Sequence, residues 1–454
     1  MRKTGNTTIS FLNKFYNQFT FGSVDNATKI NIIIFTVLAL IVIDTSLNQN
    51  SEMRSHLETS GFGIPLFVCM GIVVIGGQLY ILQYVRQKSS QIRKKAAYLR
   101  ISHNIVFLIQ YLVVSIFVFV LVQLITTQQY STIALTIVTT VTYGLTIGLM
   151  GIFTIIFFSW YKSNRNSVVI LIYGLSFAAV VIASAIFLTG SLYRLVEKPA
   201  NISAEDVAPS AKSKPGSLLY DLAKMYHYAD IVSFLLKWVA TALLLYHYSQ
   251  KMGKTKYWIL ISLPLLYFAG TYLDDYHLFE PHTEIGKLYW DLYTSLNSTA
   301  GGILFYVGFV VAARHFHGNM AVRDYLVMCG FGFLLFFSAG QSTLANTLYP
   351  PFGLATMSLY GLSTYMILLA LYSCAISVSE DIELRKSIKK STLRESKFLD
   401  SMGTAHMERD LTRRIVLKAR EEQKKRIQKS AGIKSSLTDE DIINIIEETE
   451  RDVR

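Results

Sequence analysis

Long apolar stretches separated by short polar loops dominate the chain from about residue 30 to residue 379. Several stretches reach 18 residues or more, the length that an α-helix needs to cross the hydrocarbon core of a bilayer. The pattern therefore predicts an all-α, polytopic membrane protein with about ten spanning helices. Their expected ranges are 30–47, 61–85, 102–126, 131–160, 167–190, 229–249, 257–273, 288–313, 325–347 and 352–377.

Positive charges are concentrated in alternate loops between these helices. The loop between the second and third predicted helices carries Arg86, Lys88, Arg93, Lys94, Lys95 and Arg100 and no acid. The next three loops of the same set are also basic, and Asp324 is their only acid. Loops rich in Lys and Arg stay in the cytoplasm. We therefore expect a cell-membrane protein with both termini in the cytoplasm.

The domain organisation follows from the same pattern. Residues 1–29 hold a short amphipathic segment, expected to lie along the inner membrane surface. Residues 30–379 form the membrane domain, whose longest outer loop is about 191–228. Residues 380–454 form a highly charged cytoplasmic tail with apolar residues at helical spacing.

Composition narrows the function classes. Of the 454 residues, 52% are hydrophobic and only 16% are charged, whereas soluble domains carry about 25% charged residues. This excludes a soluble enzyme and a secreted disulfide scaffold, and we expect no enzymatic activity and no cofactor. The net charge of +12 is explained by topology and by attraction to anionic lipid, so it does not indicate nucleic-acid binding.

Histidines and acids gather at the predicted outer ends of the sixth, seventh and eighth helices. Imidazole with carboxylate suits a first-row divalent ion, and histidine also suits proton sensing because it titrates near neutral pH. No spaced metal motif is present, so a solvated acidic loop remains the alternative. The cluster comprises His227, Asp230, Asp274, Asp275, His277, Glu280, His282 and Asp291, and its metal candidates are His277, Glu280 and His282.

Lys237 lies eight residues inside the predicted sixth helix, in an otherwise strongly apolar segment. A lysine at the bilayer centre costs about 2.5–3.5 kcal/mol on insertion scales, so a paired, inward-facing side chain is expected. Asp230 lies two turns away on the same face, a separation of about 10 Å that water or another helix could bridge. Asp44 and Gln341 are further candidate partners. The alternative is a lysine that snorkels toward the surface.

The predicted fourth helix contains Gly144, Gly148 and Gly151 at a spacing that lets helices approach closely. Packing within the chain is the first expectation, and a homo-oligomer interface is the second.

The tail contains two features with a functional interpretation. Four isoleucines, Ile442, Ile443, Ile445 and Ile446, give its acidic end segment an apolar face that predicts binding of a cytosolic protein. The segment SMGTAHMERDLTRR around His406 resembles the phosphoacceptor box of sensor histidine kinases, but Met407 replaces the acid and no proline follows. Only 48 residues follow His406, too few for an ATP-binding domain, so we expect a polar surface histidine.

Three function classes remain open at this stage. A large membrane part followed by a charged helical tail is similar in layout to membrane sensory modules, which favours a sensory or signalling protein. A secondary transporter with a polar site around Lys237 is the alternative. A structural subunit of a larger membrane complex is the third.

Overall fold

The computed structural model describes most of the membrane domain and part of the tail. The described residues are 24–49, 61–95, 97–165, 167–195, 201–203, 216–246, 253–275, 301–314, 320–340, 349–383, 385–386, 398–411, 414–415, 418 and 422.

The described chain is almost entirely α-helical, as the hydropathy pattern predicts. Eight of its helices are long and apolar enough to cross a membrane. The long helices are α2 (Val24–Gln49), α4 (Gly63–Lys95), α5 (Ala97–Thr127), α6 (Thr132–Ser163), α7 (Val168–Leu195), α8 (Leu218–Leu245), α10 (Lys254–Asp275), α12 (Met320–Ala339) and α13 (Leu354–Glu380). A shorter apolar helix covers Gly301–Ala313, and residues 398–411 form a helix in the tail.

Two of the ten predicted spans are not among these eight. The predicted seventh span lies within α10, whose apolar part is short because its ends carry lysines and aspartates. The predicted eighth span, 288–313, is described only from Gly301 onward. The structure therefore supports eight long apolar helices.

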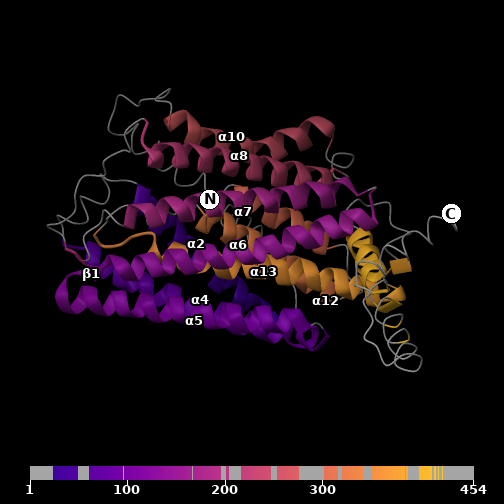
Figure 1. Ribbon diagram of the computed structural model, residues 1–454, viewed down its shortest axis with the longest axis horizontal. Helices are drawn as coiled ribbons and strands as arrows, with labels where there is room; N and C mark the ends of the chain where they lie inside the picture. Colours follow the sequence, from indigo (N-terminus) through magenta and orange to yellow (C-terminus); the bar gives the residue numbers. More distant parts are fainter. Residues whose placement is uncertain are drawn as a thin grey trace, which may run out of the picture.

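The long helices run side by side along the long axis of the molecule (Figure 1). In this view α8 and α10 lie on one side and α4 and α5 on the opposite side, with α6, α7 and α13 between them. The described tail helices lie at one end of the bundle, beside the ends of α12 and α13.

Helix α13 is the centre of the bundle. Its best apolar window is 94% buried, compared with 33% for the window of α4. Close approach of α12 contributes to this burial: a Cβ atom at Gly332 would lie 3.0 Å from the backbone nitrogen of Ile367. Small residues at helix contacts allow backbones to pack this tightly.

The buried N-terminus of α13 is capped by Asp44 of α2. The Asp44 carboxylate accepts hydrogen bonds from the backbone N–H groups of Gly353 and Thr356, both at 2.9 Å. It also accepts one from the Thr356 hydroxyl at 2.6 Å. The first N–H groups of a helix have no partner within the helix, and a carboxylate also stabilises the positive end of the helix dipole. Asp44 is therefore occupied here and does not pair with Lys237.

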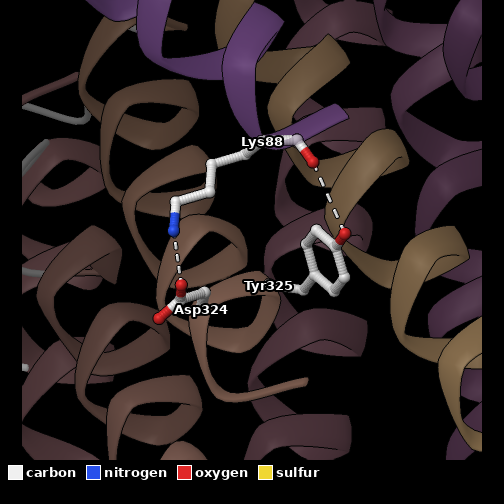
Figure 2. A network of polar contacts seen from close by, with 3 residues as sticks. All are labelled: Lys88, Asp324 and Tyr325. Carbon is white, nitrogen blue, oxygen red and sulfur yellow. Dashed lines mark hydrogen bonds and ion pairs between the residues drawn. The ribbon is translucent and has the colours of Figure 1, made fainter. Parts of the chain in front are cut away.

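The basic end of the bundle is joined by an ion pair (Figure 2). The Lys88 ammonium group of α4 lies 2.5 Å from the Asp324 carboxylate of α12. The neighbouring Tyr325 hydroxyl donates to the Lys88 carbonyl oxygen at 3.4 Å. The lone acid of the basic loops thus connects two helices that are far apart in sequence.

The opposite end carries a feature that helical periodicity did not predict. Strands β1 (Tyr130–Ser131) and β2 (Asn201–Ile202) pair antiparallel, with Tyr130 opposite Ile202. This two-residue ladder holds the first part of the predicted outer loop against the segment that directly precedes α6.

Replacing Asp44 with alanine should destabilise the bundle by about 2–4 kcal/mol, because two buried N–H groups lose their acceptor. Asp44→Asn keeps one oxygen acceptor and should destabilise the bundle less. Thermal unfolding in detergent measures both. Ser46→Ala is the matched control, since within the described ranges that hydroxyl donates to the Val42 carbonyl of its own helix. Equal melting of Asp44→Ala and Ser46→Ala would contradict the cap.

Candidate functional site: a buried charged cavity and the seam below it

Helix α8 is longer than the sequence suggested, and this positions the site. It begins at Leu218, where the Ser217 side chain accepts a hydrogen bond from the Tyr220 N–H at 3.3 Å. The segment predicted as a separate interfacial helix is therefore continuous with the predicted sixth span. Asp230 and Lys237 lie on one rigid element, and Lys237 is about 28 Å from its start.

One face of α8 is polar and turned into the bundle. Ser233, Lys237 and Thr241 are 1%, 3% and 0% exposed. In contrast, the apolar Val232 and Leu235 of the same helix are 50% and 41% exposed. The burial of Lys237 agrees with the inward-facing position that the sequence predicts, and the lysine does not snorkel.

Lys237 and Asp230 face a small cavity of about 20 Å³ between α7, α8, α12 and α13. The Lys237 ammonium group lies 5.1 Å from the ring centroid of Phe336, a cation–π contact. The opposite charges of Lys237 and Asp230 attract each other. The cavity has room for about one water molecule, so a water can bridge the two side chains as the seven-residue spacing requires.

Aromatic side chains enclose the cavity. Tyr360 of α13 lines it, and its ring is 5.2 Å from that of Tyr143 of α6. The Tyr226 hydroxyl of α8 donates to the Gly340 carbonyl oxygen at 3.5 Å, and both residues line the cavity. Sequence reasoning missed these three tyrosines, because they come from separate helices and the chain has 27 tyrosines.

A polar seam between α7 and α8 continues from the cavity toward the basic end. The Ser176 hydroxyl donates to the Ser233 carbonyl at 3.1 Å, and the Ser233 hydroxyl donates to the Ser176 carbonyl at 3.4 Å. Further along, the hydroxyls of Tyr173 and Thr241 lie 2.9 Å apart. We call these four residues the α7–α8 seam.

The seam reaches the tail helix 398–411. The ring of Phe398 lies 5.9 Å from the ring of Tyr173. Phe398 and Met402 are 4% and 0% exposed. At Gly403 a Cβ atom would lie only 2.5 Å from the Val378 side chain of α13. The start of the tail is therefore docked on the end of the bundle.

His406 is part of this docked helix, so the expectation of a polar surface histidine is wrong. Its ring contacts Tyr372 of α13 edge to face, with centroids 5.2 Å apart. Burial lowers the pKa of His406 below its ordinary value of 6.5, because a low-dielectric site disfavours the charged imidazole. The docked helix thus favours the neutral form.

The remaining predicted site residues are only partly described. His227 lies exposed on α8, and its charge interacts favourably with Asp230. Asp274 and Asp275 end α10, but their side chains lie outside the described residues. Also outside them are His277, Glu280, His282, Asp291, Gln341, Ile442, Ile443, Ile445 and Ile446. Within the described ranges, no group of three His, Cys, Asp or Glu residues could hold a metal.

The glycines of α6 do not make the close contacts expected within the chain. A Cβ atom at Gly144, Gly148 or Gly151 would meet no described atom within 4 Å. Elsewhere in the bundle, at Gly332 and Gly361, neighbouring helices do approach this closely. The glycine spacing therefore does not serve helix packing in the described part of the chain.

Comparison of the chain with protein-family models, with curated protein sequences and with solved structures finds no match. The arrangement of side chains is accordingly the basis for assigning a function.

Removing one charge of the Asp230–Lys237 pair should lower the free energy of unfolding more than removing both charges. Lys237→Met leaves the half-buried Asp230 carboxylate without the charge of Lys237. Breaking a fully buried pair costs about 3–5 kcal/mol, which sets the upper limit of the loss here. Lys237→Met combined with Asp230→Asn removes both charges and should recover much of that loss. Denaturant or thermal unfolding in detergent measures the unmodified protein and both variants.

Leu235→Met is the matched control, because this residue lies on the exposed apolar face of the same helix. It should leave the free energy of unfolding nearly unchanged. A Lys237→Met protein more stable than the unmodified one would show that the two charges do not stabilise each other.

Proposed function

We propose that the protein is a multi-pass membrane sensor. In this proposal the Asp230–Lys237 cavity responds to a condition on the outer side, and the tail passes the change to a cytosolic protein. The observation that carries the proposal is the position of Tyr173. Its hydroxyl bonds to Thr241 of the seam, while its ring contacts Phe398 of the tail helix.

The stimulus best matched to the cavity is a proton or a water-sized species. Charged residues buried in membrane helices are costly and mark functional sites by default. The cavity of about 20 Å³ has no room for an organic ligand, whereas a change of protonation requires no extra volume.

The response proposed for the tail is a change in docking. Phe398 and Met402 are buried on the bundle, whereas Leu411 and Ile415, further along, are 50% and 51% exposed. A change at Tyr173 would alter how firmly residues 398–411 are held, and with them the chain that follows. The proposed partner binds this later part of the tail, including the isoleucine face around Ile442.

Secondary transport remains the alternative because a buried lysine that faces an acid is typical of proton and ion pathways. The two functions are separable by experiment. A transporter produces proton or ion flux in proteoliposomes that Lys237→Met abolishes, whereas the sensor produces none.

Hydrogen exchange of residues 398–411 tests the sensor directly. Lys237→Met should accelerate exchange in this helix, although residue 237 is not in contact with it. Coupling energies of about 0.5–2 kcal/mol correspond to about a two- to thirtyfold change in rate. Mass spectrometry of the protein in nanodiscs provides the measurement.

Tyr173→Phe sharpens the test, because it keeps the ring against Phe398 but removes the bond to Thr241. It should also accelerate exchange, whereas the control Leu235→Met should leave exchange unchanged. If Lys237→Met alters stability while exchange at 398–411 stays the same, docking of the tail does not depend on the cavity.

A further inference from the structure

An open apolar groove runs between α5 and α6 on the outside of the bundle, with a volume of about 510 Å³. Ser102 has the one polar side chain among the described residues that line it. The groove does not belong to the Asp230–Lys237 cavity and shares no lining residue with it.

Two of the three α6 glycines that make no close helix contact lie in this groove and leave it open. Gly144 and Gly148 line it, and a Cβ atom at either position would meet nothing within 4 Å. Side chains of α5 form the opposite wall, where Leu108 and Ile105 are 72% and 48% exposed. Any longer side chain on the α6 side would fill the space that the glycines leave.

The dimensions suit a hydrocarbon chain better than a second helix. A 15 Å length of helix about 10 Å across would fill about 1200 Å³, more than twice the volume of the groove. The protruding Leu108 would also hold a helix away from the glycines. This argues against the homo-oligomer contact that the glycine spacing suggested.

The length of the groove matches one leaflet. From Ser102 to Leu112 of α5 it extends over ten residues, about 15 Å of helix. That is half of the ~30 Å hydrocarbon core of a bilayer. One acyl chain of a single leaflet would therefore lie along the groove.

The charge at the end of the groove indicates the headgroup. Arg100 is exposed two residues before Ser102, at the first position of its apolar span. A cation at this level attracts anionic headgroups, with a contribution of about 1 kcal/mol. We propose that the α5–α6 groove binds one acyl chain of an anionic phospholipid whose headgroup lies beside Arg100.

Native mass spectrometry after reconstitution tests this lipid site. The protein is taken from nanodiscs containing equal amounts of phosphatidylglycerol and phosphatidylcholine into detergent, and retained lipid is counted. The unmodified protein should keep one phosphatidylglycerol per chain. Gly148→Leu fills the groove and should reduce retention to the level of non-specific lipid.

Gly151→Leu is the matched control, because Gly151 lies on the same helix in open space but does not line the groove. It should retain lipid and melt at the same temperature as Gly148→Leu. Arg100→Gln should keep a bound lipid but lower the preference for phosphatidylglycerol by about fivefold.

Equal lipid retention by Gly148→Leu and Gly151→Leu would overturn the site. An unchanged headgroup preference in Arg100→Gln would overturn the role of Arg100. If Gly148→Leu instead separated a dimer into single chains without changing bound lipid, the groove would be an interface between copies and the lipid proposal would be wrong.

Discussion

The near-complete burial of α13 is the constraint on which the rest of the bundle depends. A helix surrounded by other helices inside a membrane has no water to satisfy its polar groups, so each must find a partner within the protein. Asp44 supplies the acceptor at its N-terminus. The Gln110 side chain donates to the Ser358 carbonyl at 2.6 Å, and His103 bonds to the Tyr365 hydroxyl at 2.8 Å. Helices α2 and α5 are thereby held in register against α13.

This central helix also connects the two regions that carry the functional proposal. Tyr360, near its capped end, lines the charged cavity. Val378 and Tyr372, near its other end, contact the docked tail helix. Because α13 is rigid and packed on all sides, it serves as a fixed support. In the proposed sensor, the seam between α7 and α8 beside it is the element that changes when the charge in the cavity changes.

Hydropathy alone predicted most of the helices, because membrane-spanning segments are long and uniformly apolar. The boundary of α8 was misjudged because its first turns carry Asp221, Lys224 and His227, which resemble a surface segment although they continue a single helix. The inward position of Lys237 was predictable from the cost of a charge in lipid and from the polar residues on its face.

The partners of the site were not predictable in the same way. The contact between Asp44 and Thr356 joins residues 312 positions apart, and no local pattern specifies such a pair. Tyr360 lines the cavity, and Tyr143 packs against its ring, only because of how their helices are rotated. The glycine spacing of α6 was misleading for a physical reason: the same small residues that permit helix contact also open a groove when no helix fills it.

The proposed sensor requires energetic coupling between the charged cavity and the docked tail, and a double-mutant cycle measures that coupling. Lys237→Met and Phe398→Ala are made singly and together, and the unfolding free energy of each protein is determined in the same detergent. Phe398 does not line the cavity, so independent sites would give additive losses. Coupled sites should give an interaction energy of at least about 0.5 kcal/mol, whereas losses that add within about 0.3 kcal/mol would contradict the coupling.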